Sequence, residues 1–371
     1  VQLTGTSGNR IILGFIIATA FLSMWLSNTA TTMMMFPIAL SVIAVMKEHP
    51  QQGSNLGHFS MALMLVIAYA SNIGGMATII GTPPNVAFTA FIERKYGYTI
   101  QFAHWMLLCT PLAILLLASL YMVLTRWLFP NRIYHSTNAQ QFIRGELAAL
   151  GPMSVAEKRV LFVFAGTACL WVFKDLINQL QWLRLDDQMI AILGALLLFI
   201  VPAGDGKNRS VLLEWQDTSR LAWGILLLFG GGIALAAALE KAGVMELIGN
   251  SMSSLGAIHT GLLVLMIVVV SIFLSEVMSN VAQVIVLAPV LAAMADSWQL
   301  DPLLLGMPMT LAASAASMLP MGTPPNAIVF SSGLIPLPKM LRAGLLLNLI
   351  SIIVITLFCW LLLPWIMPMV R

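Results

Sequence analysis

The chain has 371 residues, of which 59% are hydrophobic and only 9% are charged, and its formal net charge is +3. An average soluble domain carries about one quarter charged residues, so this composition excludes a soluble fold of this size. The positive charges are few and scattered, which excludes a nucleic-acid partner. The composition therefore predicts an all-α polytopic membrane protein.

Residue types that commonly carry enzyme chemistry are dispersed along the chain. The three cysteines, Cys109, Cys169 and Cys359, lie far apart inside apolar runs, and we interpret them as buried small hydrophobic residues rather than as disulfides or metal ligands. The five histidines lie at or near the edges of apolar runs, where interfacial positions are favoured over a proton relay. Without paired catalytic carboxylates or a nucleophile with its base, the sequence predicts that the protein is not an enzyme.

The first apolar segments are too long for single straight helices. The run 11–46 is interrupted near its middle by the polar segment WLSNTA at 25–30, which predicts a helical hairpin with a polar tip. The run 57–92 contains GTPPN at 81–85, which predicts a helix that is broken inside the membrane. One further helix is expected at 103–129, and residues 1–129 together form a first repeat.

The middle of the chain has a different character. Residues 130–159 are polar and mixed in charge, and they are predicted to form a cytoplasmic connector with a short interfacial helix. Scaffold helices of the second repeat are expected over 160–255. They include crossings at 160–173, 188–204 and 221–239.

The last block, 256–371, follows the plan of the first. A second hairpin is expected at 259–296, where SEVMSNVA interrupts the apolar run. A second broken helix at 302–338 again carries GTPPN, and a final helix is expected at 343–370. Hairpin, broken helix and helix thus occur twice.

The two blocks are predicted to have opposite orientations. A hairpin returns the chain to the face it left, and an odd number of crossings separates the two hairpins, so they open toward opposite faces. Inverted repeats with paired broken helices are typical of secondary transporters, which bind substrate and ions near the membrane midplane. Two opposed hairpins favour an occluded site over the continuous pore of a channel. The expected fold is therefore an inverted-repeat ion-transporter fold with two helical hairpins and two broken helices.

The same symmetry and the charge distribution bear on the termini. About three crossings are expected before Val1 by symmetry, so we interpret the chain as N-terminally truncated, as its non-Met start also suggests. The parity of the crossings assigns most of the 18 lysine and arginine residues to one face, which the positive-inside rule makes cytoplasmic. This predicts a multi-pass protein of a bacterial-type inner membrane with its C-terminus outside, on the periplasmic side.

The tips and breaks carry the residues that could bind ions and a dianion. An asparagine amide can ligate a cation through its oxygen while its NH₂ donates to a carboxylate, so Asn28 and Asn280 can each contact both ion and substrate. Carbonyls that a proline leaves without partners suit Na⁺, and the N-terminus of each second hairpin arm favours an anion. No Lys or Arg lies near either tip in the sequence, so helix ends and co-transported sodium must supply the positive charge.

Glu276 is a charged residue inside the second hairpin. It is the only charged residue between Leu247 and Ala295 and lies three residues before Ser279. Carboxylates inside a membrane usually mark function. We favour a buried, hydrogen-bonded support of the hairpin tip over direct sodium ligation or proton transfer.

The segments SNTATTMMMFPIA, IGTPPN, SEVMSNVAQVIVLAPV and MGTPPNAIVF resemble the divalent anion/sodium symporter family of INDY-like di- and tricarboxylate transporters. The resemblance covers nearly the whole chain. It implies secondary active, sodium-coupled symport of a small divalent anion such as a C4 dicarboxylate (succinate, malate, fumarate). It also implies a homodimer in which a transport domain moves as an elevator against a scaffold domain. The alternatives are a symporter of sulfate or another inorganic anion, and a sodium-independent dicarboxylate exchanger.

The resemblance also implies roles for individual residues, with at least two sodium sites. The first sodium site takes Ser23, Ser27, Asn28 and the Gly81 carbonyl, and the second takes Asn280, the backbone of Ser275 and Met278, and the Gly322 carbonyl. The substrate contacts are Asn28, Thr29, Thr82, Pro83, Ser279, Asn280, Val281, Thr323 and Pro324. Val281 departs from the family pattern, which has threonine there. The missing hydroxyl removes one potential donor to a carboxylate, on the order of 1 kcal/mol, so it bears on substrate identity.

Overall fold

The computed structural model describes residues 7–48, 55–133, 151–179, 185–204, 211–220 and 259–370, together with isolated positions between 145 and 148 and between 227 and 243. The chain divides into two compact units. The larger unit comprises Val1–Ile100, Trp105–Ile143 and Leu228–Arg371, and the smaller unit comprises Gln101–His104 and Arg144–Leu227. Both predicted hairpins and both predicted broken helices belong to the larger unit.

The first set of helices has the predicted order. It consists of α1 (Gly8–Ser23), α2 (Asn28–Glu48), α3 (Leu56–Met76), α4 (Pro83–Tyr96) and α5 (Phe102–Met122), which continues as the π-helical turn η1 (Val123–Leu128). The hairpin turns between α1 and α2, and the broken helix is interrupted between α3 and α4.

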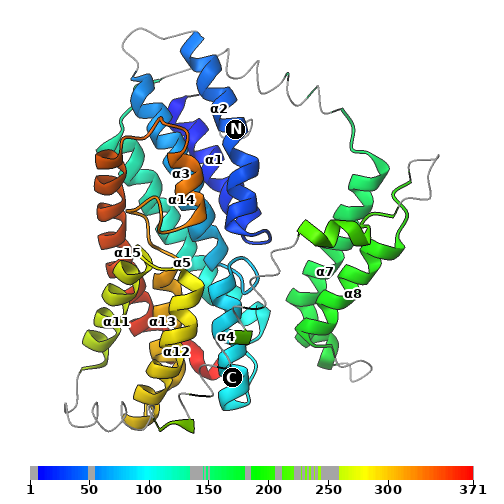
Figure 1. Ribbon diagram of the computed structural model, residues 1–371, viewed down its shortest axis with the longest axis vertical. Coiled ribbons are helices and arrows are strands. Elements are labelled where there is room, and N and C mark those ends of the chain that lie inside the picture. Colours follow the sequence, from blue (N-terminus) through cyan, green and yellow to red (C-terminus); the bar gives the residue numbers. More distant parts are fainter. Residues whose placement is uncertain are drawn as a thin grey trace. The chain divides into compact units, whose positions relative to one another are not determined.

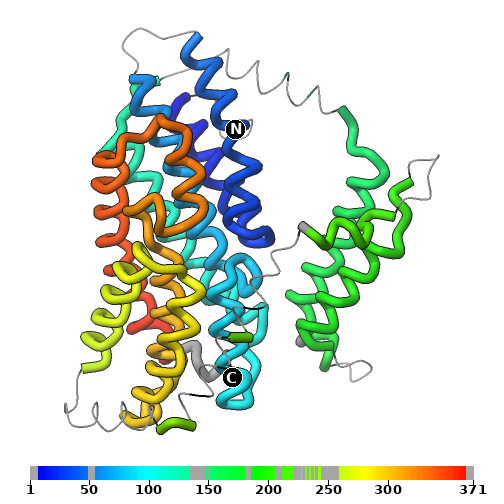
Figure 2. The backbone as a smooth tube through the Cα atoms, in the orientation of Figure 1, coloured from blue at the N-terminus to red at the C-terminus, as the bar shows by residue number. Residues whose placement is uncertain are grey.

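The second set repeats this order. It consists of α11 (Thr260–Ser275), α12 (Asn280–Ser297), α13 (Pro302–Ala313), α14 (Pro324–Phe330) and α15 (Leu337–Val370). Figure 1 shows the two hairpins entering the larger unit from opposite ends, and Figure 2 shows each chain path turning back near the middle. The predicted fold class, with two hairpins and two broken helices of opposite orientation, is confirmed.

One short helix of each set packs against helices of the other set. Helix α3 is buried along almost its whole length and packs against α1 and α2, as α13 packs against α11 and α12. The short helices cross over, because α14 packs against α2 and α3 whereas α4 packs against α12 and α13. Each half-helix that begins with a Pro-Pro pair therefore packs against the other repeat, and this brings the two breaks together.

The smaller unit contains α7 (Val155–Gln179) and α8 (Asp187–Ile200), together with the 3₁₀ turn η2 (Trp215–Arg220). Lys174 pairs with Asp187 at 2.9 Å and joins the two helices. The predicted crossing at 221–239, apart from isolated positions, and half of the predicted connector lie outside the described residues.

Exposed apolar side chains agree with a bilayer environment. In the part of the chain that the structure describes, five helices are long and apolar enough to cross a membrane. Phe162 on α7 is 81% exposed, and its neighbours on this helix are also largely exposed. Cys109 and Cys359 are buried as predicted, but the prediction for Cys169 was wrong, because it is exposed on α7. An apolar membrane helix can present its surface to lipid, so an apolar sequence does not require burial within the protein.

The close contact between α1 and α3 depends on glycine. A Cβ atom added at Gly74 would lie 2.6 Å from the Cα atom of Ala20 and 2.9 Å from its carbonyl carbon. Side chains cannot tolerate such distances to backbone, so α1 approaches α3 only where α3 lacks a Cβ atom. Small residues serve this purpose at helix contacts in membranes.

We predict that Gly74→Ala lowers stability by about 1–3 kcal/mol, because the added methyl group pushes the two backbones apart. The measurement is the thermal midpoint of the detergent-solubilised protein. Gly57→Ala is the matched control, since it lies on the same helix and its added Cβ atom would meet only Asn55 Oδ1, at 3.5 Å. Equal midpoints for the two variants would contradict the proposed role of Gly74.

Candidate functional site

The site is assembled where the two hairpin tips meet the two breaks. A direct hydrogen bond joins the repeats, because Asn72 Nδ2 on α3 donates to Thr323 Oγ1 at 3.0 Å. Thr323 is the N-cap residue of α14, as Thr82 is of α4. Residues 251 positions apart in the chain are thus in contact within this buried region.

The first tip gathers oxygen atoms around Asn28. One end of its side-chain amide lies 2.8 Å from Ser23 Oγ, 3.0 Å from the Ser71 carbonyl oxygen and 3.3 Å from the Gly81 carbonyl oxygen. Two arrangements satisfy such a group of atoms. Either the amide NH₂ occupies this end and donates to the three oxygens, or Oδ1 occupies it and a cation lies between the four oxygens. Three of these oxygens belong to residues predicted for the first sodium site, namely Ser23, Asn28 and Gly81.

Glycine makes the close grouping at the first tip possible. A Cβ atom added at Gly75 would collide with Asn28 Oδ1 and lie 3.1 Å from the Gly81 carbonyl oxygen. One added at Gly81 would lie 2.9 Å from the Ser23 carbonyl oxygen. The run of glycines therefore lets the backbone of the break approach the tip, which a ligand set of carbonyl oxygens requires.

The second tip shows the same pairing in another setting. Ser275 Oγ lies 2.5 Å from Asn280 Oδ1 and 2.6 Å from the Ala313 carbonyl oxygen. One hydroxyl proton cannot serve both acceptors, so these atoms also form a small cluster of oxygens. Ser23 and Ser275 each precede their asparagine by five residues. The repeat is thus visible at the level of single atoms.

The predicted site residues that remain occupy the surroundings of these clusters. Ser27 and Ser279 are exposed at the tips, Ser27 accepts a hydrogen bond from the Ala30 N–H group at 3.3 Å, and the Pro324 ring is also exposed. Five of the predicted contacts are half-buried, and four others are buried. The half-buried ones are Thr29, Pro83, Met278, Asn280 and Val281, and the buried ones are Thr82, Ser275, Gly322 and Thr323.

The Pro-Pro pairs act differently from the prediction. They occupy the first turn of α4 and of α14, where the missing N–H group of proline leaves no bond unmade, so they begin the second half-helix. The carbonyls upstream are not all free. Asn85 Nδ2 donates to the Thr78 carbonyl at 2.8 Å, and Asn326 Nδ2 donates to the Leu319 carbonyl at 3.1 Å. The asparagine of each GTPPN motif thus satisfies a backbone carbonyl that lies upstream of the motif.

Glu276 supports the second break. Its Oε1 atom accepts hydrogen bonds from the N–H groups of Ser317 (2.9 Å) and Met318 (2.8 Å) and from Asn348 Nδ2 (2.7 Å). Its Oε2 atom accepts from the Leu319 N–H group at 2.8 Å. Three successive N–H groups form a nest of the kind that binds anions. The carboxylate thereby ties the tip to the break, in agreement with the interpretation favoured from the sequence.

The first repeat makes this connection without a charge. Met24 occupies the position that corresponds to Glu276, and its carbonyl accepts a 2.5 Å hydrogen bond from Thr78 Oγ1. Thr78 Oγ1 in turn accepts from the Gly81 N–H group at 3.0 Å. A threonine in the break therefore replaces the carboxylate at the tip.

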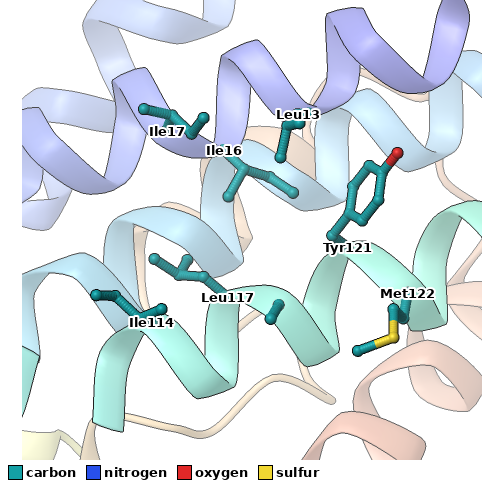
Figure 3. A pocket seen from close by; sticks show the side chains of 8 residues that line it. Leu13, Ile16, Ile17, Ile114, Leu117, Tyr121 and Met122 are labelled. Atoms are coloured by element: carbon teal, nitrogen blue, oxygen red, sulfur yellow. The ribbon is translucent and has the colours of Figure 1, made fainter. Parts of the chain in front are cut away.

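An apolar cavity between α1 and α5 does not have the character of this site. It has a volume of about 350 Å³, and Tyr121 is the only residue among those that line it with a polar side-chain atom (Figure 3). A dianion there would lose its hydration without receiving hydrogen bonds in return. The polar groups at the tips are therefore a better candidate site for an anion than this cavity.

Several residues of the site were missed from the sequence. They are Asn72, Thr78, Asn85, Asn326 and Asn348. The pair Ser71-Asn72 inside an otherwise apolar helix repeats the Ser-Asn dipeptide of the tips, and this signal was available. Asn348 lies in the last apolar helix and gives no comparable signal.

We predict that Glu276→Gln destabilises the protein by about 1–3 kcal/mol, because the amide NH₂ must face an N–H donor wherever it is placed. The measurement is again the thermal midpoint in detergent. Glu48→Gln is the control, since Glu48 is exposed at the end of α2. An unchanged midpoint in Glu276→Gln would show that the nest does not hold the break.

Comparisons with known proteins agree with this arrangement. A family model described as the sodium:sulfate symporter transmembrane region matches residues 1–368. The sodium-dependent dicarboxylate transporter SdcS of Staphylococcus saprophyticus is 37% identical over 370 residues, which cover 98% of this chain and 71% of the relative. SdcS of Staphylococcus aureus strain USA300 is 37% identical and that of strain MRSA252 is 36% identical, each with the same coverage. The chain therefore belongs to the sodium:sulfate symporter family, the divalent anion/sodium symporters that its motifs resemble, and it is a transporter rather than an enzyme.

Proposed function

We propose that this transporter carries a small divalent anion, in the first place a C4 dicarboxylate such as succinate, malate or fumarate, together with Na⁺. The observation that carries the proposal is the gathering of hydroxyl, amide and carbonyl groups at the first tip, where the Asn28 amide lies 2.8–3.3 Å from Ser23 Oγ and from the Ser71 and Gly81 carbonyl oxygens. Hydroxyl, amide and carbonyl oxygens are the ligands that a hard cation prefers. The names of the relatives, sodium-dependent dicarboxylate transporters, support the same function.

Two sodium sites fit the repeat. The first uses Ser23, Asn28 and the Gly81 carbonyl, with Ser27 at its outer edge. The second uses Asn280 and backbone oxygens of Ser275, Met278 and Gly322. Binding at both sites adds two positive charges to a region in which the segments 11–46 and 242–338 contribute no Lys or Arg.

The anion is placed between the two tips. The N-termini of α2 and α12 begin at Asn28 and Asn280, so their free N–H groups and positive dipole ends favour a carboxylate there. Thr82 and Thr323, with Pro83 and Pro324 beside them, extend the contacts toward the breaks, and Thr29, Ser279 and Val281 complete the tips. Because sodium supplies the compensating charge, substrate affinity depends on sodium and transport of the two is coupled.

The moving part is inferred to be the larger unit, which holds both tips. The smaller unit, with the exposed apolar faces of α7 and α8, acts as the scaffold and as part of a homodimer interface in an elevator mechanism. The charge distribution supports a location in a bacterial-type inner membrane with the C-terminus on the periplasmic side.

Sulfate transport is the second candidate, and Val281 favours it. A tetrahedral dianion needs fewer donors at the second tip than an extended dicarboxylate, and Val281 offers none.

Uptake of radiolabelled succinate into proteoliposomes, with and without a sodium gradient and with unlabelled sulfate as competitor, separates these functions. Saturable, sodium-dependent succinate uptake that sulfate does not inhibit is the expected result. Succinate counterflow without sodium would instead identify an exchanger.

We predict that Ser23→Ala raises the sodium concentration for half-maximal succinate uptake about tenfold, because one oxygen of the first cluster is lost. Ser41→Ala is the control, since its exposed hydroxyl on α2 bonds only the Pro37 carbonyl among the described groups. Similar sodium curves for the two variants would place the cation elsewhere.

We predict that Val281→Thr lowers the KM for succinate about fivefold, because the added hydroxyl can donate to a carboxylate, a gain of about 1 kcal/mol. Val286→Thr makes the same change at a position of α12 that is 42% exposed and serves as the control. An unchanged KM in Val281→Thr would mean that residue 281 does not face the substrate.

A further inference from the structure

Asn72 lies between the first sodium cluster and the substrate-contacting residues of the second repeat. It is only 2% exposed and sits on α3, a helix that is buried almost throughout. Its Nδ2 atom donates to Thr323 Oγ1 at 3.0 Å, and its Oδ1 atom faces Asn28 Nδ2 at 3.5 Å. One amide thus contacts a residue of each half of the site.

The contacts of Thr323 fix where its proton points. Its Oγ1 atom accepts from Asn72 Nδ2 and also from the Asn326 N–H group at 3.3 Å, so both lone pairs are engaged. A hydroxyl whose lone pairs are both used must direct its O–H bond elsewhere. In this state Thr323 is available as a hydrogen-bond donor, which is the role that an anionic oxygen requires.

The orientation of the Asn28 amide decides whether its NH₂ group or its Oδ1 atom faces the Asn72 amide. When Oδ1 of Asn28 stays in the oxygen cluster, its NH₂ faces Asn72 Oδ1, and this is the orientation that a bound cation favours. When no cation is bound, rotation of the Asn28 amide gives its NH₂ three acceptors, namely the Gly81 carbonyl, the Ser71 carbonyl and Ser23 Oγ. Rotation also turns Oδ1 of Asn28 toward Asn72.

We propose that Asn28, Asn72 and Thr323 form an amide relay through which sodium at the first tip sets the hydrogen-bonding role of Thr323 toward the substrate. The relay rests on the proposed function. With sodium bound, Asn72 donates to Thr323, and the threonine proton is free for an oxygen of the dianion. Without sodium, Asn72 rotates so that its Oδ1 atom accepts the threonine proton, and the substrate loses that donor.

The relay runs in one direction only. In the second repeat, the carbonyl oxygen beside the Ser275–Asn280 pair belongs to Ala313, as the one beside the Ser23–Asn28 pair belongs to Ser71, so Ser314 corresponds to Asn72. Among the described residues, the buried Ser314 hydroxyl group has no hydrogen-bond partner. Among the described residues, no hydrogen bond of Ser314 therefore joins the second tip to Thr82. Sodium at the first tip acts on the side of the site where Val281 has removed a hydroxyl, so the contribution of Thr323 is correspondingly larger there.

The test is a double-mutant cycle on the KM for succinate in proteoliposomes, measured at low and at saturating sodium. The variants are Asn72→Leu, which keeps the branched shape of the side chain and removes the amide, Thr323→Val, and the two combined. Asn72→Ser, which is polar but too short to reach both partners, replaces Asn72→Leu if that variant does not elute as a single species. Gln283→Leu is the matched control, because Gln283 is also a buried amide but bonds to Ser271 within the second hairpin.

Asn72→Leu is expected to raise the KM for succinate about tenfold at saturating sodium, and by less than about twofold when Thr323 is already valine. It should also reduce, by about threefold or more, the factor by which sodium lowers that KM. The effects of Gln283→Leu and Thr323→Val on the KM should multiply in the double variant. Gln283→Leu should also leave unchanged the factor by which sodium lowers the KM. Multiplicative effects of Asn72→Leu and Thr323→Val, or an unchanged sodium factor in Asn72→Leu, would overturn the relay alone. Absence of sodium-dependent uptake by the unaltered protein would overturn the proposed function and the relay with it.

Discussion

The structure depends on breaks in the backbone at membrane depth. In hydrocarbon each unpaired N–H or C=O group costs several kcal/mol, so a chain can leave the helical path only where other groups take up its hydrogen bonds. Asn85 and Asn326 do this for the carbonyls upstream of the two Pro-Pro pairs. The nest around Glu276 does it for the N–H groups of the second break.

The two repeats solve the same problem with different residues. The tip of the first is tied to its break by Thr78, which bonds the Met24 carbonyl, whereas the tip of the second is tied by the side chain of Glu276. Tip and break must stay together in both cases, since each cluster takes oxygens from the two. The crossing of α4 and α14 to the opposite repeat then holds the two clusters in one packed unit. An inverted repeat thus gives one site with two unequal halves.

The sequence predicts the parts of this architecture that are local. Polar segments such as WLSNTA inside apolar runs, and the repeated GTPPN motif, place the hairpins and the breaks, because a membrane helix tolerates such residues only where it is interrupted. Contacts between distant residues could not be predicted in this way. The bond from Asn72 to Thr323 and the bonds of Asn85 depend on how the half-helices turn after the break. The exposure of Cys169 was missed because hydropathy reports a preference for lipid as much as for a protein core.

The asymmetry between the halves has a consequence for coupling. A site whose halves were identical would respond equally to sodium at either tip, and neither ion would have a separate role. Here Asn72 connects the first cluster to Thr323 of the opposite repeat, whereas Ser314, at the corresponding position of the second repeat, has no hydrogen-bond partner among the described residues. Under the proposed relay, thermodynamic reciprocity requires that a substrate that needs the Thr323 proton also tightens sodium binding at the first tip. The relay would then give the first sodium ion the larger role in recognition of the anion, and the second would contribute mainly its charge.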